Sequence, residues 1–403
     1  MFKSILQYLL SNISFLFSLI SCLRLFFRIK KKKIDIYFSP EGGFGPTISK
    51  YLILRCKYKK DNNFLLIFGY NPKRHNKLVS ELFDQNFEWL SLTNKFIPFM
   101  TISETNKYLV FKILKYLLKN FSNAKSIEYL NDYFCKFWNI NSFPQEKENQ
   151  YGSYRKIHKY IHQNEEHIIF NKNLIINIKK KINFGLSEKK CTIFLRNKGL
   201  NSEDISARLR DTDIFKNYKA AIEKNIEKGW QFFLSGDHIE KPDWAKKYES
   251  KLIFFSDTEL SKDEYNIFTG LNSDCFISSG SGPVSWKFLE PKKPFLIIDG
   301  YPFAFGWYKS TIAYKIINDT YKFKTFEEIF SEKCLKIEPP INSSFLNSVE
   351  KTLIISEFLD NFNFGKITGL DWQELNLKED CLLNAGYAKA SKEWCKIQKS
   401  KFN

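Results

Sequence analysis

The chain has 403 residues, of which 62 are Lys or Arg and 44 are Asp or Glu, so its formal net charge is +18. Its 43% hydrophobic and 26% charged residues are those of a chain that buries a core, which excludes intrinsically disordered, collagen-like and Pro/Gly-rich proteins. Since a domain holds roughly 100 to 200 residues, we expect two domains.

The positive charge points to a membrane surface before it points to nucleic acid. Lys, Asn, Ile and Phe are abundant, as A/T-rich codons would make them, and the one dense basic run, residues 30–33, lies beside a hydrophobic segment. No nucleic-acid-binding module is visible. The eight cysteines form no CxxC pair, so neither a zinc site nor a disulfide framework is predicted, and we expect a reducing compartment.

The N-terminal segment predicts an anchor helix over residues 1–33. Residues 4–23 carry no charge and have the length, roughly 20 residues, that spans a bilayer. Polar residues recur every three or four positions and form one stripe of a helix that leads to Arg28: Ser4, Gln7, Ser11, Ser14, Ser18 and Ser21. Such a helix can lie in the membrane surface with its apolar side down while residues 30–33 bind anionic lipid.

Two alternatives remain open for this helix. It can span the membrane with the Ser stripe as a helix-packing face, or it can be a core helix or a cleaved signal. A cleaved signal fits worst, because only Lys3 precedes the apolar run. The surface-lying and spanning helices both leave the body at the cytoplasmic face of the cell membrane, either peripheral or single-pass.

From residue 34 the pattern becomes that of alternating strands and helices. Residues 34–39 and 64–69 predict strands on either side of a glycine loop and an apolar helix that ends at Cys56. Residues 74–85 predict a helix, residues 103–182 predict mostly helix, and the polar segment 144–156 predicts a loop. This series forms an N-terminal Rossmann-like domain over residues 34–182.

A second series begins at Cys191 and defines a C-terminal Rossmann-like domain over residues 183–345. Short apolar strands alternate with helices, which indicates a parallel sheet covered on both faces. The predicted strands are 191–196, 230–236, 251–256, 274–279 and 294–299, and the predicted helices are 214–229, 262–271 and 281–290. Residues 346–403 predict helices that pack back on the domains. The fold class is therefore α/β, with two Rossmann-like domains and an N-terminal membrane-associated helix.

Ligands of open parallel sheets bind beyond the carboxyl ends of the strands, so the loops there are the candidate sites. After the fourth strand, Ser279, Gly280, Ser281 and Gly282 lead into a helix and present backbone N–H groups, hydroxyls and a helix N-terminus to an anion such as phosphate. The alternative is a tight turn whose glycines allow close packing. The loop lacks the Gly-Lys-Ser/Thr ending of a P-loop, so ATP hydrolysis is not supported.

Two other strand ends of this domain carry charged residues. Arg196 ends the first strand directly after five apolar residues, and Arg208 lies in the polar loop that follows. A guanidinium donates two parallel N–H bonds that fit a diphosphate, although Arg208 alone also suits a solvated helix entry. Asp237 ends the second strand, where it can bind a ribose or sugar hydroxyl, or cap a turn.

The glycine loop of the N-terminal domain is a candidate acceptor site. Gly42, Gly43 and Gly45 let a substrate approach the backbone, and Glu41 is a candidate general base. The loop lacks the GxGxxG pattern, so the signal it gives is weak.

No metal site is predicted. Asp211 and Asp213 match the D-x-D pattern of metal-dependent glycosyltransferases, but they directly precede a helix, where acidic residues act as caps. His158, His162 and His167 lie near helical spacing without a clear fourth ligand, which is typical of a solvated helix face.

The second half of the chain resembles a known family. The segments that carry the resemblance are TIFLRNKG (192–199), Asp204, Ile205 and Arg208, NYKAAIEKNIEKGWQFFLSGD (217–237) and LNSDCFISSGSGPVSWKFLEPKKPFLIIDGYP (271–302). They resemble glycosyltransferases from bacterial surface-polysaccharide gene clusters, which are similar to the GT-B glycosyltransferases. The resemblance covers about 110 residues well and extends more loosely to the N-terminal strand and glycine loop.

The resemblance implies a metal-independent GT-B enzyme with a nucleotide-sugar donor in the C-terminal domain, an acceptor toward the N-terminal domain and no cofactor. Arg196 and the loop from Ser279 to Gly282 would contact the donor diphosphate, and Asp237 would lie in the donor cleft. One departure is clear: relatives often have His-x-Arg-Asp where this chain has Phe194, Leu195, Arg196 and Asn197, which leaves altered chemistry or lost activity open.

We therefore expect a glycosyltransferase that moves a sugar from a nucleotide-diphosphate donor to a lipid-linked or surface-polysaccharide acceptor at the cytoplasmic membrane face. One alternative is a polysaccharide-modifying transferase of the pyruvyl or phosphosugar type on the same scaffold. The other is a non-catalytic, membrane-associated glycan-binding protein. The departures from the family pattern around Arg196 favour this alternative. Nucleotide binding separates the first expectation from both alternatives.

Overall fold

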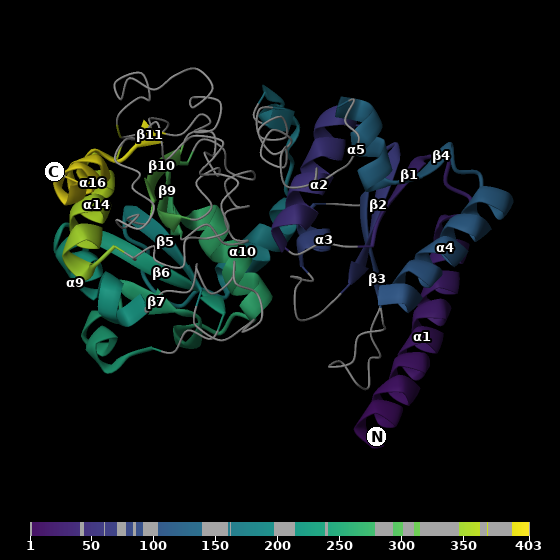
Figure 1. Cartoon of the computed structure of the whole chain (residues 1–403), viewed down its shortest axis with the longest axis horizontal. Coiled ribbons are helices and arrows are strands. Elements are labelled where there is room, and N and C mark those ends of the chain that lie inside the picture. Colours follow the sequence, from purple (N-terminus) through teal and green to yellow (C-terminus); the bar gives the residue numbers. More distant parts are fainter. Residues whose placement is uncertain are drawn as a thin grey trace. The chain divides into compact units, whose positions relative to one another are not determined.

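The computed structural model describes residues 2–40, 44–59, 61–70, 78–83, 86–91, 104–138, 160–161, 163–196, 214–237, 241–278, 293–300, 310–314, 346–362, 369 and 389–402 (Figure 1). The chain divides into two compact units. Unit 1 holds residues 1–146 and 163–174, and unit 2 holds residues 147–162 and 175–403. The domain boundaries predicted after residues 33, 182 and 345 remain predictions.

Unit 1 contains a parallel sheet whose described strands have the order β3-β2-β1-β4. The strands are β1 (Asp35–Ser39), β2 (Phe64–Tyr70), β3 (Phe87–Ser91) and β4 (Ser126–Tyr129). The helices are α1 (Phe2–Ile29), α2 (Phe44–Tyr58), α3 (Val79–Leu82), α4 (Glu104–Phe121), α5 (Leu130–Trp138) and the 3-10 turn η2 (Glu165–His167). Helix α7 (Lys172–Lys180) lies at the division between the units.

Alternating side chains of β1 pack against different helices, as a strand period of two requires. Ile36 and Phe38 lie in a core that α1 and α4 complete. Tyr37 points to the other face, where its ring lies 4.9 Å from that of Tyr133 on α5 and its hydroxyl is 2.8 Å from that of Tyr58 on α2. The sheet is therefore covered on both faces, as its apolar strands predicted.

A polar network closes the amino end of β1. The Asp35 carboxylate accepts hydrogen bonds from the Tyr58 hydroxyl at 2.7 Å and from the Ser126 hydroxyl of β4 at 2.6 Å. Lys57 Nζ lies 4.3 Å from the ring centroid of Tyr133, and burial lowers the pKa of this amine. Burial likewise raises the pKa of Tyr37 to about 12. These groups join β1, β4, α2 and α5 at the edge opposite the candidate acceptor loop.

Unit 2 contains a larger parallel sheet, with the described order β11-β10-β9-β8-β5-β6-β7. The strands are β5 (Lys189–Arg196), β6 (Trp230–Asp237), β7 (Leu252–Phe254), β8 (Cys275–Ser278), β9 (Phe295–Gly300), β10 (Ser310–Tyr314) and β11 (Lys389–Ala390). The helices are α9 (Ile214–Glu227), α10 (Lys262–Asn272), α14 (Ser348–Asp360), α16 (Lys392–Phe402) and the 3-10 turns η3 (Asp243–Tyr248) and η4 (Phe255–Asp257).

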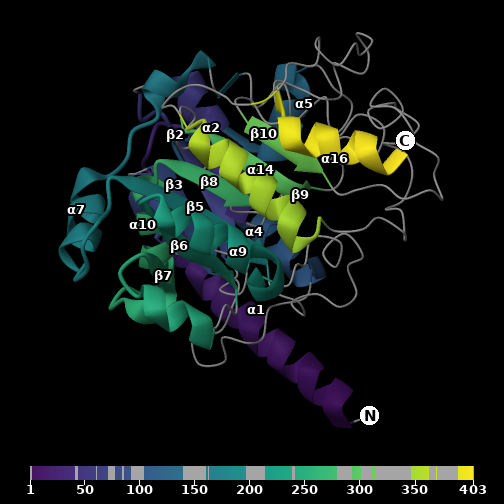
Figure 2. The ribbon, with the colours of Figure 1, turned by 90° about the vertical axis from the view of Figure 1, so that its left-hand side faces the viewer.

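Helices cover both faces of this sheet. On one face α9, α14 and α16 pack over Cys191, Ile193 and Trp230, and Figure 2 shows α14 lying along α9. On the other face Phe268 of α10 packs edge-on against Phe233, with 5.4 Å between ring centroids. Helix α10 begins with a capping box in which Ser261 accepts from the Glu264 N–H and the Glu264 carboxylate accepts from the Ser261 N–H.

The structure confirms the strands predicted at 34–39, 64–69, 191–196, 230–236, 274–279 and 294–299 to within two residues. The strand predicted at 251–256 is shorter, because a 3-10 turn follows Phe254, whose N–H donates to Asp257 Oδ2 at 2.9 Å. Most of the described residues of 103–182 are helical, as predicted, although β4 interrupts them, and β3 was not predicted. Both are edge strands, and the side chains of β4 are only half-buried, so no continuous apolar run marks that strand. The predicted loop 144–156 and helix 281–290 lie outside the described residues.

Helix α1 confirms the N-terminal helix, and two members of the predicted polar stripe, Ser14 and Ser18, are buried and not turned to solvent. Ser14 and Ser18 are 1% and 0% exposed, and the Ser18 hydroxyl donates to the Ser14 carbonyl at 2.9 Å. The following turn packs on α4 through Cys22 and continues into the core with Ile29. Among the helices that the structure describes, none combines the length and apolar character that crossing a membrane requires.

Tyr265 gives a stability prediction for unit 2. Its buried hydroxyl is shared between the carbonyl oxygens of Leu234 on β6 at 3.1 Å and Ile253 on β7 at 2.9 Å. We expect Tyr265→Phe to lower the free energy of unfolding by about 1–2 kcal/mol, because both carbonyls lose a buried donor. Denaturant unfolding measures this. Tyr248→Phe is the control, since its 3.4 Å contact with Glu223 is half-exposed and a change below about 0.5 kcal/mol is expected. Equal losses in both variants would contradict the assignment.

Candidate functional site

The carboxyl edge of the unit 2 sheet contains a point where the strand order reverses. From β5 the chain proceeds to β6 and then β7 on one side, and it later returns to the other side of β5 with β8 and β9. The reversal therefore lies between β5 and β8. Open parallel sheets bind their ligands in the crevice outside the strands at such a point.

Two of the predicted positions lie beside this point. Arg196 and Asp237 are paired in register across β5 and β6, as the last residues of their strands. Strand β8 lies on the side of β5 opposite to β6, and its last residue, Ser278, pairs with Phe194 of β5. Ser278, the residue before the predicted loop, therefore lies in the strand next to the one that ends at Arg196.

Most of the predicted side chains lie outside the described residues. For Arg196 and Asp237 the structure describes the strand but not the side chain, and for Gly236 it gives a φ of 152°, a conformation that favours glycine. The following predicted residues lie wholly outside: Arg208, Ser279, Gly280, Ser281 and Gly282. What the structure contributes is the placement of these strand ends side by side.

Side chains just below this edge are described. The Ser235 hydroxyl of β6 donates to Asn266 Oδ1 of α10 at 2.8 Å. The Ser278 hydroxyl is fully buried, and no hydrogen-bond partner for it lies among the residues that the structure describes. A buried hydroxyl ordinarily has a partner, so Ser278 presents hydrogen-bonding capacity at the start of the predicted anion loop.

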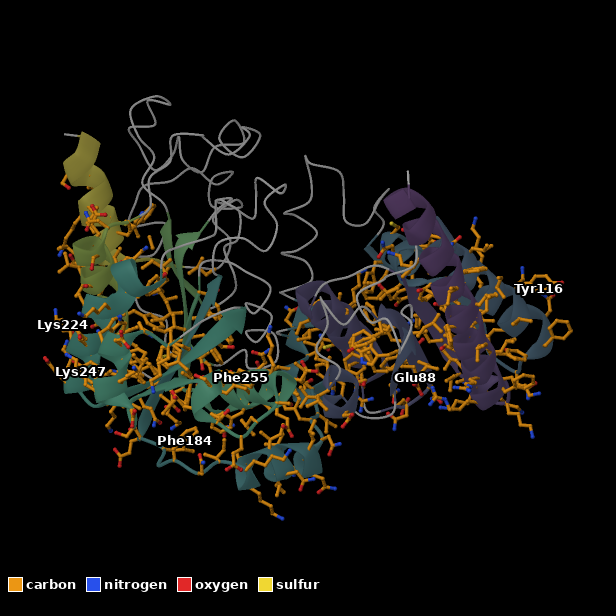
Figure 3. The ribbon with its side chains drawn as sticks, turned by 90° about the horizontal axis from the view of Figure 1, so that it is seen from below. Glu88, Tyr116, Phe184, Lys224, Lys247 and Phe255 are labelled. Atoms are coloured by element: carbon orange, nitrogen blue, oxygen red, sulfur yellow. The ribbon has the colours of Figure 1, made fainter. Side chains whose placement is uncertain are left out.

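The structure adds three residues at the carboxyl ends of β6 and β7 that sequence reasoning missed. Lys241 and Asp257 form an ion pair at 2.9 Å, and both are largely buried. Phe255 follows β7, is 43% exposed and lies 5.9 Å from the Tyr265 ring, centroid to centroid (Figure 3). The sequence contained a signal for Phe255, because the apolar run of the predicted strand 251–256 continues through Phe255 although β7 ends at Phe254.

The unit 1 sheet also reverses its strand order, between β1 and β4. At the carboxyl end of β1 the buried Lys50 amine of α2 donates to the buried Ser39 hydroxyl at 3.0 Å. Of the predicted acceptor loop, Glu41, Gly42 and Gly43 lie outside the described residues.

Gly45 is described and lies in the first turn of α2, so the predicted loop ends earlier than expected, where the helix begins at Phe44. Pro46 fits there, because the first turn of a helix does not need its N–H.

Within the described parts of the chain, no group of three or more His, Cys, Asp or Glu side chains is placed to hold a metal ion. His167 lies 3.1 Å from Glu166, while His158, His162, Asp211 and Asp213 lie outside the described residues. The six described cysteines are free thiols, and burial raises the pKa of Cys22 to about 11 and of Cys56 to about 12.

Comparison with known proteins gives similarity to solved glycosyltransferases and their complexes. No protein-family model matches the chain, and no curated protein sequence matches it. POFUT1 in complex with GDP is similar over 65% of this chain and 95% of its own, with 13% identity and a TM-score of 0.36. The fucosyltransferase NodZ from Bradyrhizobium is similar over 64% and 93%, with 10% identity and a TM-score of 0.31.

A variant of the wall teichoic acid polymerase TagF is similar over 93% of this chain and 89% of its own. The identity is 10% and the TM-score 0.32. At these identities, and with TM-scores below 0.5, the similarity assigns this chain neither an activity nor site residues.

Proposed function

We propose that the chain is a GT-B-type glycosyltransferase that transfers a sugar from a nucleoside-diphosphate sugar to a lipid-linked or surface-polysaccharide acceptor. The observation that carries the proposal is the register pair of Arg196 and Asp237 beside the point where the strand order of unit 2 reverses. A cation and a carboxylate at that edge suit a diphosphate and a sugar or ribose hydroxyl respectively.

In this proposal, catalysis depends on positioning and on neutralising the leaving diphosphate without a metal. Arg196, with Arg208, donates hydrogen bonds to the diphosphate oxygens as negative charge develops on them. The backbone N–H groups from Ser279 to Gly282 and the hydroxyl of the preceding Ser278 add further donors. Asp237 binds a hydroxyl of the donor and holds the sugar in place.

The acceptor is proposed to bind toward the glycine loop of unit 1. Glu41 would take the proton of the acceptor hydroxyl if the reaction inverts the configuration at the sugar. Gly42 and Gly43 would let the acceptor approach the backbone. The buried amine of Lys50, 3.0 Å from the Ser39 hydroxyl, places positive charge beneath this strand end.

We also propose that α1 holds the protein at the cytoplasmic face of the cell membrane. The helix exposes large apolar side chains at Ile13, Leu16, Ile20, Leu23 and Phe27, which recur every three or four residues. The basic run 30–33 directly follows. An apolar stripe with a basic flank is the pattern of a helix that lies in a membrane surface.

Donor binding is tested by titrating the detergent-solubilised protein with UDP, GDP, CMP and their sugars and recording the melting temperature. At one hundred times the dissociation constant, a ligand that binds only the folded state stabilises it by about 2.7 kcal/mol. We expect one nucleoside diphosphate to raise the melting temperature of the natural protein and to have no effect on Arg196→Ala.

The matched control is Lys189→Ala, which removes a positive charge at the opposite end of the same strand. It should keep the full shift. A protein that melts cooperatively yet responds to none of the nucleotides would contradict the proposal, and would favour a pyruvyl-type transferase or a glycan-binding protein instead.

A further inference from the structure

Helix α4 lies beside α1, although about 80 residues separate the two helices in the sequence. Both run into a strand of the same sheet, α1 into β1 and α4 into β4, and Figure 1 shows them side by side. Two backbone bonds join their ends: Asn123 N–H donates to the Lys30 carbonyl at 2.8 Å, and Lys125 N–H donates to the Ile34 carbonyl at 2.9 Å. The two helices therefore form one layer.

The layer is basic and contains no acidic residue over most of its length. Residues 1–34 hold seven Lys or Arg, residues 105–127 hold five Lys, and neither segment contains Asp or Glu. These two segments together supply twelve of the eighteen net positive charges of the chain. Seven of these charges lie on the two helices, and five follow the helices directly, in the run 30–33 and at Lys125.

The outer side of α4 repeats the pattern of the exposed stripe of α1. Leu109 is 43% exposed and Tyr116 is 63% exposed. Lys112, between them, and Lys119, one turn after Tyr116, are also exposed. These residues recur every three or four positions, so they lie on one face of the helix. Figure 3 shows Tyr116 pointing away from the ribbon of α4.

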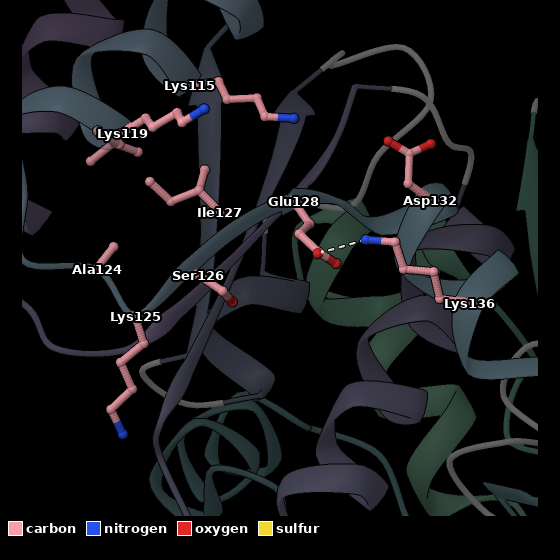
Figure 4. A pocket seen from close by; sticks show the side chains of 10 residues that line it. Lys115, Lys119, Ala124, Lys125, Ser126, Ile127, Glu128, Asp132 and Lys136 are labelled. Carbon is pink, nitrogen blue, oxygen red and sulfur yellow. Dashed lines mark hydrogen bonds and ion pairs between the residues drawn. The ribbon is translucent and has the colours of Figure 1, made fainter.

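A groove of about 480 Å³ continues this surface along the open edge of β4 (Figure 4). Lys115 and Lys119 of α4 line it together with Lys125. Two acidic side chains, Glu128 and Asp132, also line the groove, and Glu128 is paired with Lys136 at 2.9 Å. The basic run 30–33 lies next to its Lys125 end, because residues 123 and 125 bond to residues 30 and 34.

We infer that the exposed sides of α1 and α4 together form one docking surface for an anionic lipid bilayer, with the groove beside β4 receiving lipid phosphate. The inference rests on the proposed membrane attachment through α1 and extends it to α4 and the groove. Exposed Leu, Ile, Phe and Tyr side chains enter the acyl boundary, while the lysines between them bind anionic headgroups.

The charge pattern selects this occupant over two others. A second copy of the same face would bring two basic layers together and would be repelled. A nucleic acid would engage the lysines through its phosphates but would leave the apolar stripe in water. A bilayer with anionic lipids covers both kinds of side chain at once.

The test is co-sedimentation of the full-length protein with vesicles, either of phosphatidylcholine alone or with about one third phosphatidylglycerol. Each Lys near an anionic surface contributes about 1 kcal/mol, so the double variant Lys112→Ala, Lys119→Ala should weaken binding to the anionic vesicles about tenfold to thirtyfold. Tyr116→Ser should also weaken it. The control double variant Lys224→Ala, Lys399→Ala removes two exposed helix lysines of unit 2 and should bind as the natural protein does.

Several outcomes overturn the inference. If the α4 variants bind normally while Leu16→Ser does not, α1 alone is the anchor. If the unit 2 control loses as much affinity as the α4 variant, overall charge and not this surface governs binding. Tighter binding to duplex DNA than to the anionic vesicles, lost in the same variants, would identify a nucleic-acid site. Absence of vesicle binding would overturn the membrane attachment as well, whereas the nucleotide titration would still test the donor site separately.

Discussion

Replacing Arg196 with alanine is expected to lower turnover of the donor sugar nucleotide by about 100- to 1000-fold, the usual effect of removing one preorganised donor to a developing negative charge. Arg196 ends β5 beside the strand-order reversal, in register with Asp237 of β6. Ile193 and Phe194, which precede it in β5, are buried. The backbone at Arg196 is therefore held in place by the packed strand. In the proposed reaction, its hydrogen bonds to the leaving diphosphate would therefore need little reorganisation.

The measurement is release of nucleoside diphosphate from the donor that the thermal titration identifies. Arg196→Lys keeps the positive charge but loses the two-pronged hydrogen bond, so its turnover should fall between those of the natural protein and Arg196→Ala. Lys189→Ala, at the amino end of the same strand, should retain normal turnover. If Arg196→Ala binds and turns over the donor normally, Arg196 does not contact the diphosphate.

The sequence predicted the central strands of both sheets because they are nearly continuous apolar runs. In β2 every side chain up to Gly69 is buried, and β8 is buried throughout. The strands β4 and β11 are only partly buried, so they carried no such signal and were missed, whereas β7 is buried throughout and was predicted. Which strand lies next to which was not predicted from the sequence either, since the order depends on long-range pairing.

The polar stripe of α1 shows why burial cannot be deduced from residue type alone. The spacing of Ser14 and Ser18 correctly identified one face of the helix. In the structure these two side chains are buried in unit 1, and the Ser18 hydroxyl donates to the Ser14 carbonyl of its own helix, so this buried donor has a partner. Large apolar side chains of α1 remain exposed at Ile13, Leu16, Ile20, Leu23 and Phe27, whereas Leu25, Phe26 and Ile29 are buried in the core.

The candidate site was predicted through strand ends and not through side-chain partners. The positions of Arg196 and Asp237 followed from where apolar runs stop, and their register confirms that these residues are neighbours. Lys241 and Asp257 were missed because their ion pair depends on the turn after β7. No local pattern encodes such a contact between two loops.

Trp230→Ala is expected to lower the free energy of unfolding of unit 2 by about 3–5 kcal/mol, the usual cost of removing a large aromatic side chain from a core. Trp230 is 1% exposed and begins β6, directly after Gly229, whose φ of 89° favours glycine. Its ring meets that of Phe362 edge-on with 5.3 Å between centroids. The cavity would lie where β6 joins the helices of the same face.

Hydrogen exchange distinguishes a local loss from a global one, because each unit has its own core. In Trp230→Ala, amides of β5 and β6 should exchange faster, while those of β1 and β2 keep their natural rates. Trp230→Phe retains a ring at the same place and should show a smaller acceleration. Equal acceleration in both sheets would mean that the two units unfold as one cooperative body, and unchanged exchange in β5 and β6 would place Trp230 outside the core. Since the proposed donor site is built on the ends of β5 and β6, the same variant should also weaken nucleotide binding as these strands open.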